Sequence, residues 1–156
     1  MISVDIDKKA LVLFSGGLDS TTTLAYALSN QFKIIALTIN YKQRHRYEIE
    51  ASKKIIDSYP DAEQIIFDID LTRIGGSALT DNTIEVPKTN TNGIPITYVP
   101  ARNTIFLSIA ASYAEKYKIR DIFIGVNAID YSGYPDCRPE FIRSYEHMIN
   151  LGTKAG

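Results

Sequence analysis

The segment ALVLFSGGLDS, residues 10–20, decides the fold that this sequence predicts. Its apolar half predicts a buried strand, and the apolar spacing that follows at 21–28 predicts a helix. Gly16 and Gly17 allow positive φ and a close approach of the backbone to a ligand. The N–H groups of the turn and of the first helical turn then point toward one place, which suits a phosphate. The alternative is an ordinary tight turn with a serine or aspartate helix cap.

Strands and helices alternate along the rest of the chain. The apolar patterns predict strands at 33–39, 64–69 and 121–126, and helices at 47–59, 104–117 and 139–150. This alternation is typical of βαβ units, so we expect a single α/β domain over residues 1–156, with a parallel sheet covered by helices on both faces. Ligands bind such sheets beyond the carboxyl ends of the strands. Residues 15–20, 40–45 and 125–136 are therefore expected to converge on one rim.

Composition narrows the class of protein. The chain has 156 residues, a formal net charge of −1 and a single cysteine. A net charge so close to zero gives no reason to expect a nucleic-acid partner, and one cysteine cannot form an internal disulfide. The N-terminus lacks the basic and apolar regions of a signal peptide, and no apolar run reaches the length of a membrane span. We expect a soluble, cytoplasmic protein without a membrane partner.

One long segment interrupts the alternation. Residues 71–100 contain Gly75, Gly76 and several prolines, with little apolar periodicity. Loops of this length are uncommon in compact domains and serve either as functional lids or as surface decoration. The sequence leaves both interpretations open.

Four stretches together resemble one family of enzymes. They are FSGGLDSTT at 14–22, YKQRH at 41–45, YVPARN at 98–103 and GVNAIDYSGYPDCRPEF at 125–141. The first resembles the PP-loop of the N-type ATP pyrophosphatases and lacks the lysine of a Walker loop. Together they resemble the 7-cyano-7-deazaguanine synthase family over essentially the whole chain. The resemblance implies a Rossmann-like PP-loop fold of the adenine nucleotide alpha hydrolase type.

The resemblance also implies a reaction. Members of the family are C–N ligases that activate 7-carboxy-7-deazaguanine with ATP, capture it with ammonia as an amide, and activate the amide oxygen again to leave 7-cyano-7-deazaguanine, a precursor of queuosine. The expected cofactors are ATP and Mg²⁺, the expected partners are these small molecules, and a homodimer is left open. Two other hypotheses stay open: a PP-loop enzyme of the tRNA-thiolation type, and an ATP-binding module without catalysis.

The residues that the resemblance assigns to ATP surround the glycine turn. They are Phe14, Ser15, Gly16, Gly17, Leu18, Asp19, Ser20, Thr21, Thr22, Thr23 and Leu24. Asp19 is the expected ligand of Mg²⁺, because this ion prefers a carboxylate together with phosphate oxygens. Asp19 and Arg102 are the expected catalytic residues, and residues 37–39 are expected to face the adenine.

A second set of residues is assigned to phosphate or to the substrate. It includes Gln43, Arg44, His45 and Arg102, since arginine binds phosphate or carboxylate in a bidentate manner and histidine titrates near neutral pH. The alternatives are a solvated helix start for Arg44 and His45, and an ordinary surface arginine for Arg102. Asn103 is expected to cap the helix that follows it.

The stretch from Asp130 onward is the expected substrate pocket. A deazaguanine presents an N–H and an amino group on one edge, so Asp130 or Asp136 is the candidate acceptor. Tyr131 or Tyr134 would stack on the ring, and Arg138 would meet the 7-carboxylate. The alternative for Asp136 is a cap of the last helix.

The zinc ligands of the family are missing from this sequence. Relatives continue past the last residue of this chain and carry four cysteines that bind a structural zinc. Cys137 with His45 and His147 cannot form a tetrahedral zinc site of the usual kind, so no zinc ligand is predicted for this chain. Cys137 is open to interpretation as a packing residue or a nucleophile, and its flanking residues favour the structural role.

Overall fold

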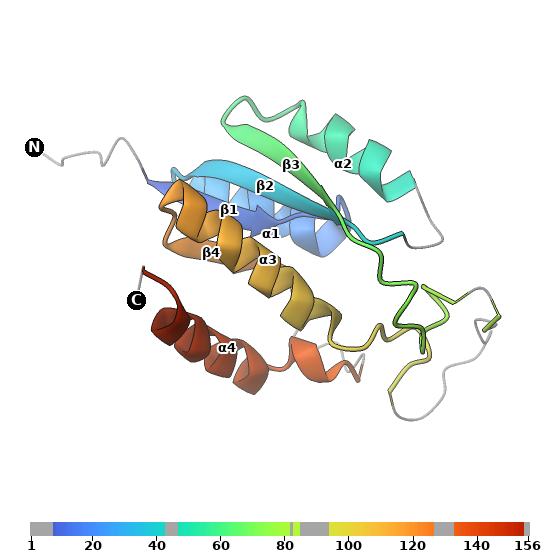
Figure 1. The fold of residues 1–156 in the computed structure, drawn as a ribbon. Helices are drawn as coiled ribbons and strands as arrows, with labels where there is room; N and C mark the ends of the chain where they lie inside the picture. The colour runs from blue at the N-terminus through green and yellow to red at the C-terminus, as the bar shows by residue number, and fades with distance from the viewer. Residues whose placement is uncertain (1–7, 43–46, 82, 85–93, 127–132, 155–156) are drawn as a thin grey trace, which may run out of the picture.

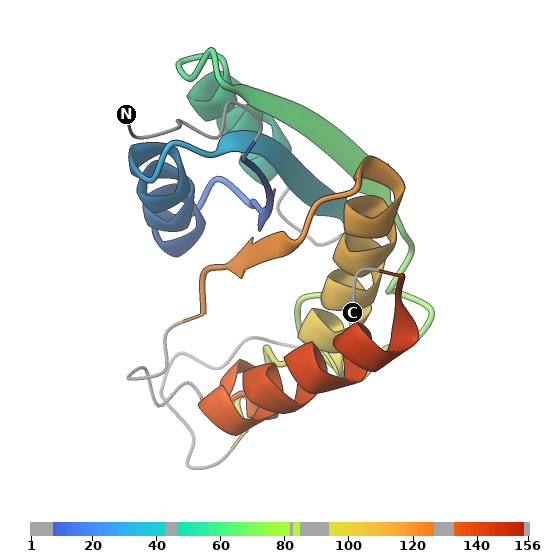
Figure 2. The ribbon, with the colours of Figure 1, turned by 90° about the vertical axis from the view of Figure 1, so that its left-hand side faces the viewer.

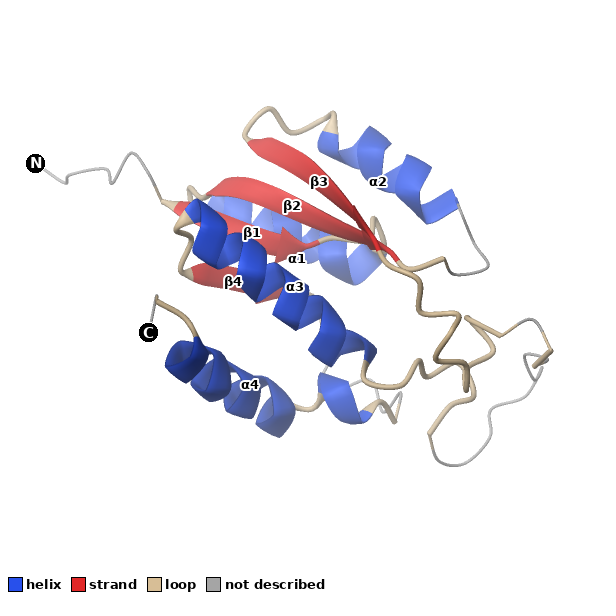
Figure 3. Cartoon of the chain, in the orientation of Figure 1, coloured by secondary structure: helices blue, strands red, loops and turns tan. Residues whose placement is uncertain are grey.

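The computed structural model describes residues 8–42, 47–81, 83–84, 94–126 and 133–154, whose arrangement is shown in Figure 1. The elements follow in the order β1 (Lys9–Leu13), α1 (Leu18–Ser29), β2 (Lys33–Asn40), α2 (Tyr47–Ile56), β3 (Ala62–Asp68), α3 (Arg102–Tyr117), β4 (Asp121–Ile124), the short 3-10 helix η1 (Pro135–Cys137) and α4 (Pro139–Gly152). Each predicted strand and helix is therefore confirmed, apart from the positions of its ends. Figure 3 shows the helices packed around the strands.

The strands form one parallel sheet in the order β3-β2-β1-β4. The chain moves outward on one side of β1 to β2 and β3, and β4 then joins the other side of β1. The end of β1 therefore lies at a switch point of the topology, where parallel sheets bind their ligands. The predicted fold class, a Rossmann-like parallel sheet with helices on both faces, is confirmed.

Alternate residues of the central strands supply two halves of the core, because neighbouring side chains of a strand point to opposite faces of the sheet. Ala10 and Val12 of β1 pack with Leu24 and Ala27 of α1 and with Ile56 of α2. The opposite face packs against α3 and α4, through Leu11, Leu13, Ile35, Leu37, Leu107, Ala110 and Tyr145. Figure 2 shows α1 and α3 on opposite sides of the strands. Burial on both faces explains why β1 and β2 are almost continuous apolar runs.

Some element ends differ from the prediction for local reasons. Helix α2 ends at Ile56 rather than at residue 59, because the chain closes into tight turns there. The N–H of Ser58 donates to the carbonyl of Ile55 at 3.1 Å, and the N–H of Tyr59 donates to that of Ile56 at 2.8 Å. Strand β3 begins early, at Ala62, where it enters the register of β2.

The described parts of residues 71–100 contain turns but no helix or strand. The segment is nevertheless anchored at both ends, since Leu71 and Val99 are buried together with Tyr41, which follows β2. Ser77 and Ala78 are fully buried as well, and the Ala78 N–H donates to the carbonyl of Ile96 at 2.9 Å. These anchored parts pack beside the C-terminal end of β2 and the first turns of α3.

Candidate functional site

Residues 15–20, which we call the PP-loop, join the end of β1 to the first turn of α1. Serine hydrogen bonds hold this loop: the Ser15 N–H donates to Ser20 Oγ at 3.3 Å, and the Ser20 hydroxyl donates to the Gly17 carbonyl at 3.0 Å. The N-cap residue of α1 is Gly17, and no side chain of the described residues caps the helix. The alternative of a serine or aspartate cap is therefore wrong, and the first N–H groups of α1 lack the side-chain acceptor that a cap supplies.

Glycines let two neighbouring elements approach the PP-loop closely. Gly16 has a φ of +84°, and a Cβ at this residue would lie 3.0 Å from the backbone N and Cα of Ser52 in α2. Gly125 follows β4, and a Cβ there would lie 2.9 Å from the backbone carbonyl of Asp19. Helix α2 and the end of β4 therefore hold the PP-loop from two sides. β4 ends at Ile124, short of the predicted residue 126, because its partner strand β1 ends at Leu13, which pairs with Ile124.

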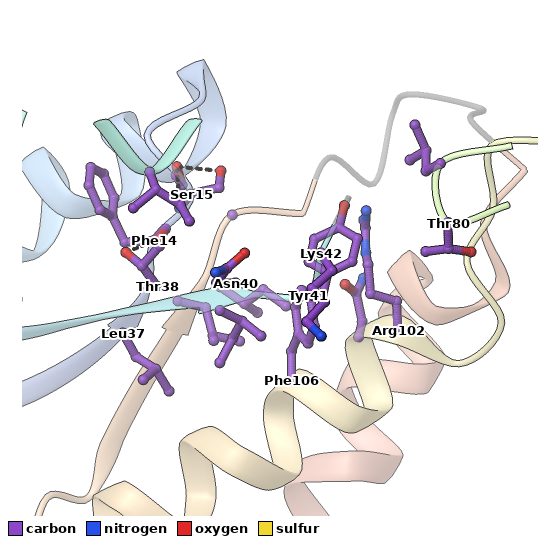
Figure 4. A pocket seen from close by; sticks show the side chains of 18 of the residues that line it. Phe14, Ser15, Leu37, Thr38, Asn40, Tyr41, Lys42, Thr80, Arg102 and Phe106 are labelled. Atoms are coloured by element: carbon purple, nitrogen blue, oxygen red, sulfur yellow. Dashed lines mark hydrogen bonds between the residues drawn. The ribbon is translucent and has the colours of Figure 1, made fainter. Parts of the chain in front are cut away.

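A cleft of about 1010 Å³ opens beyond the carboxyl ends of β1, β2 and β4. Ser15 lies at one end of this cleft, and Thr80 and Arg102 lie at the other, as Figure 4 shows. Residues 37–42, at the end of β2, line the space between them. Small-molecule sites span roughly 300–1,000 Å³, so this cleft has room for a nucleotide and a second small ligand. The expected rim is confirmed for Ser15, Ser20, residues 40–42 and Gly125, which line the cleft, whereas residues 133–136 do not. Residues 43–45 and 127–132 lie outside the described residues.

Arg102 is the first residue of α3 and is half-buried at the cleft. Its guanidinium carbon lies 5.9 Å from the ring centre of Phe106, one turn along the helix. Ala101, directly before it, has a left-handed φ of 52°, and its N–H donates to Tyr98 Oη at 3.0 Å. A non-glycine residue in this region is strained, and such strain is concentrated at functional sites. The strained turn starts α3 so that Arg102 lines the cleft.

Asp136 fixes the start of the same helix. Its Oδ2 accepts a hydrogen bond from the backbone N–H of Asn103 at 2.9 Å, and its backbone carbonyl accepts one from Asn103 Nδ2 at 3.0 Å. The predicted cap by Asn103 is therefore wrong: Asn103 lies inside the first turn, and the capping carboxylate comes from η1. The predicted alternative for Asp136 is corrected too, because this residue caps α3 and not α4.

Cys137 is the last residue of η1 and contacts the start of α3. Its Sγ accepts a hydrogen bond from Asn103 Nδ2 at 3.3 Å. Partial burial, followed by the neighbouring Asp136 carboxylate, raises the pKa of the Cys137 thiol. A raised pKa keeps the thiol protonated, which fits the structural role rather than that of a nucleophile.

A Lys42–Asp70 pair beside the cleft is a feature that sequence reasoning missed. Lys42 lines the cleft, and its Nζ lies 2.9 Å from Asp70 Oδ2. Asp70 Oδ1 accepts hydrogen bonds from the hydroxyl and the N–H of Thr72, at 2.5 and 3.1 Å. The Thr72 hydroxyl, followed by Lys42, lowers the pKa of Asp70 from 3.8 to about 2. Only the pairing of β2 with β3 brings Lys42 and Asp70 together, so no local sequence signal marks them.

The residues assigned to ATP are divided between the cleft and α1. Phe14, Ser15 and Ser20 line the cleft. Leu18 is 83% exposed, whereas Leu24 is fully buried in the core under the sheet and supports the helix instead of lining the cleft. The hydroxyls of Thr22 and Thr23 donate to backbone carbonyls within α1.

The residues assigned to the substrate are only partly described. Gln43, Arg44, His45, Asp130 and Tyr131 lie outside the described residues. Arg138 is exposed at the N-cap of α4. Tyr134 packs its ring 5.6 Å from that of Tyr98, and its hydroxyl lies 2.8 Å from the hydroxyl of Thr97. Asp136, as described above, is engaged with α3.

The described ranges bear on the binding of metals and on membranes. They contain no group of three or more His, Cys, Asp or Glu side chains placed to hold a metal ion. Mg²⁺ needs fewer protein ligands when phosphates supply the rest, and Asp19 is a carboxylate within the PP-loop, in the first turn of α1. In the same ranges, no helix combines the length and the apolar character that a membrane crossing requires.

Comparison with known proteins agrees with the four motifs. Residues 9–156 match the family described as queuosine biosynthesis protein QueC. The 7-cyano-7-deazaguanine synthases of Ralstonia nicotianae and Ectopseudomonas mendocina are 57% and 54% identical to this chain over 150 residues, which cover 96% of the chain and 67% of each relative. This chain thus spans about two thirds of the length of these relatives.

A solved structure shares the fold at much lower sequence identity. It is a predicted subunit of tRNA methyltransferase from Methanocaldococcus jannaschii, with a TM-score of 0.56 and 17% identity over 91% of this chain and 64% of that one. The family match, the two synthases and the PP-loop at the end of β1 lead to one assignment. The chain belongs to the queuosine biosynthesis protein QueC family.

Proposed function

We propose that this chain converts 7-carboxy-7-deazaguanine and ammonia to 7-cyano-7-deazaguanine at the expense of ATP. The observation that carries this proposal is the PP-loop, whose uncapped helix start opens into one end of a cleft of about 1010 Å³. Helix N-termini without side-chain caps bind phosphate groups well. Curated relatives that share more than half of their aligned residues with this chain are 7-cyano-7-deazaguanine synthases.

The proposed chemistry uses one cleft for two activations. The substrate carboxylate attacks the α-phosphorus of ATP and releases pyrophosphate, and ammonia then displaces AMP to give the amide. The amide oxygen attacks a second ATP in the same way, and loss of AMP and two N–H protons leaves the nitrile. In both stages negative charge develops on the departing pyrophosphate, where preorganised donors lower the barrier most.

The residues at the PP-loop are suited to that charge. The backbone N–H groups of the first turn of α1, with the hydroxyl of Ser15, would hold the β- and γ-phosphates. Ser20, whose hydroxyl donates to the Gly17 carbonyl, would keep the loop in shape for them. Asp19 would hold Mg²⁺, which neutralises charge on the phosphate oxygens when it is bound. Residues 37–39 line the middle of the cleft and would face the adenine.

Arg102 is suited to the reacting end of the cleft. It lies across the cleft from the PP-loop, where the α-phosphate would meet the substrate carboxylate (Figure 4). A guanidinium pairs with phosphate or carboxylate in a bidentate manner. Since Asp136 is bound to the start of α3, Asp130 is the proposed acceptor for the amino edge of the deazaguanine.

We further propose that the chain forms a single domain that acts on small molecules in the cytoplasm. The strands of the described residues all belong to one sheet with a core on each face, which supports one domain. The lone cysteine fits a reducing compartment. A homodimer remains compatible with the fold, and sedimentation of the purified chain would determine its oligomeric state.

The reaction can be tested with the purified chain, ATP, Mg²⁺, ammonium and 7-carboxy-7-deazaguanine, with products read by mass spectrometry. We expect the nitrile, with AMP and pyrophosphate in a ratio of two each per nitrile. The amide alone would show that only the first activation takes place. ATP binding without either product would refute the proposed ligase activity and favour an ATP-binding module.

A further inference from the structure

A partly buried hydrogen-bond network lies behind the PP-loop, and three of its members, Phe14, Thr38 and Ile49, also line the cleft. Its centre is Gln64 of β3, whose Nε2 donates to Thr38 Oγ1 at 2.8 Å and to Ser52 Oγ at 2.9 Å. The Thr38 hydroxyl donates to the Phe14 carbonyl at 2.8 Å, and the Ser52 hydroxyl donates to the Ile49 carbonyl at 2.8 Å. One side chain of β3 is thus joined to β2, to α2 and, through Thr38, to the residue after β1.

The direction of every proton in this network is fixed. A carbonyl oxygen only accepts, so both hydroxyl protons are committed to the Phe14 and Ile49 carbonyls. Each hydroxyl oxygen must therefore accept from Gln64, and an amide NH₂ supplies the two N–H donors that this requires. Thr38 is 3% exposed and Ser52 is fully buried, so water could hardly replace the Gln64 N–H donors if they were removed.

Both branches of the network lead to backbone that borders the PP-loop. Phe14 directly precedes the loop, and its N–H donates to the Leu37 carbonyl at 2.9 Å, so β2 holds both backbone polar groups of Phe14. Ser52 packs against Gly16, whose missing Cβ would lie 3.0 Å from the Ser52 backbone. Through Thr38 and Ser52, Gln64 is therefore linked to Phe14 and Gly16, the two neighbours of Ser15. Gln64 itself does not line the cleft.

We propose that Gln64 is a positioning residue, which sets the conformation of the PP-loop for phosphate binding through Thr38 and Ser52. The proposal rests on the proposed function, because it takes the PP-loop to be the site of the ATP phosphates. A carboxylate in place of the amide would lose both donors and face two oxygen lone pairs, at almost the same side-chain volume. The contacts of this side chain therefore demand glutamine.

The test compares Gln64→Glu with Glu63→Gln, the reverse exchange at the adjacent, exposed residue on the other face of β3. Hydrogen exchange of the ligand-free proteins reports the loop directly. We expect faster exchange at residues 14–20 in Gln64→Glu and no change there in Glu63→Gln. Calorimetry should show ATP binding weakened about tenfold in Gln64→Glu, the size expected for the loss of hydrogen bonds between buried groups.

A pH series separates positioning from general stability. As pH falls, the introduced carboxyl gains a proton and can donate one hydrogen bond again, so ATP affinity of Gln64→Glu should recover in part while that of the wild type does not follow. Thr38→Val removes one branch, and its effect should not add to that of Gln64→Glu because both act through one network. If Gln64→Glu does not fold, Gln64→Met removes the same donors without introducing charge.

The outcomes are distinct for the two proposals. Unchanged loop exchange and unchanged ATP affinity in a folded variant would overturn the role of Gln64, even if its melting temperature falls. Faster loop exchange and weaker ATP binding, in a chain that forms no nitrile, would uphold that role and refute the ligase. A wild type that binds no ATP would refute the ligase, and loop exchange would still decide whether Gln64 orders the loop.

Discussion

At the scale of single residues, the site depends on places where the backbone itself must come close to a neighbour. Gly16 is one of them, because it combines a φ of +84° with backbone atoms of Ser52 at 3.0 Å from a would-be Cβ. Gly16→Ala should lower the unfolding free energy by about 2–4 kcal/mol, from left-handed strain and from overpacking together. ATP affinity should fall as well, because the loop must move away from α2. Urea unfolding and calorimetry would measure the two effects.

Gly75 offers a matched control for that substitution. It has a φ of +68°, but no atom lies within 4 Å of a Cβ built there. Gly75→Ala should therefore cost only the backbone strain, about 1–2 kcal/mol, and leave ATP affinity unchanged. Equal losses of unfolding free energy and of ATP affinity in the two variants would show that the contact of Gly16 with Ser52 is unimportant.

Asp70 should make the stability of the fold depend on pH in the acidic range. Its pKa is lowered from 3.8 to about 2, first by the Thr72 hydroxyl and then by Lys42. A lowered pKa in the folded state stabilises the fold above pH 3.8, and this contribution is lost as pH falls toward about 2. Asp70→Asn should therefore reduce the urea midpoint at pH 5, and this difference should disappear as pH falls through about 2. Thr72→Val should remove more of the effect than Lys42→Met, and a pH-independent difference would contradict the assignment.

At the scale of elements, the contact between η1 and the start of α3 matters most for the site. Asp136→Ala removes the acceptor of the Asn103 N–H and should cost about 1–2 kcal/mol, as the loss of a helix cap does. Asp136→Asn keeps an oxygen acceptor and should cost less. Because α3 carries Arg102, kcat should fall in both variants while ATP affinity changes little. Asp121→Ala, at an exposed residue, is the control, and thermal melts with steady-state kinetics would measure both effects.

The contact between η1 and α3 also shows what the sequence can and cannot predict. The PP-loop was predictable because strand, glycine turn and helix are contiguous in the sequence. Its glycines also indicate positive φ and a close approach of the backbone, which are local properties. The predicted cap by Asn103 failed because the true acceptor, Asp136, arrives from far along the chain. Gln64 and the Lys42–Asp70 pair stayed hidden for the same reason, since their partners meet only through the pairing of β2 with β3.

At the scale of the whole molecule, ligand binding and folding should be linked. ATP that binds only the folded chain stabilises it by about 2.7 kcal/mol at one hundred times its dissociation constant. For a domain of this size we expect a rise in melting temperature of roughly 5–10 °C. Mg²⁺ should increase the shift, and both EDTA and Asp19→Asn should reduce it. Asp57→Asn, at an exposed residue after α2, should respond like the wild type, and an equal shift without Mg²⁺ would argue against Asp19 as its ligand.

The strand order also has a consequence for synthesis on the ribosome. β1, β2 and β3 are neighbours in the sheet and are made first, together with α1 and α2, which cover one face. The opposite face waits for α3, which is complete only when Tyr117 has been added. At roughly 5–20 residues per second this delay lasts some seconds, during which the nascent chain presents the side chains of Leu11, Leu13, Ile35 and Leu37 to the ribosome exit and its chaperones.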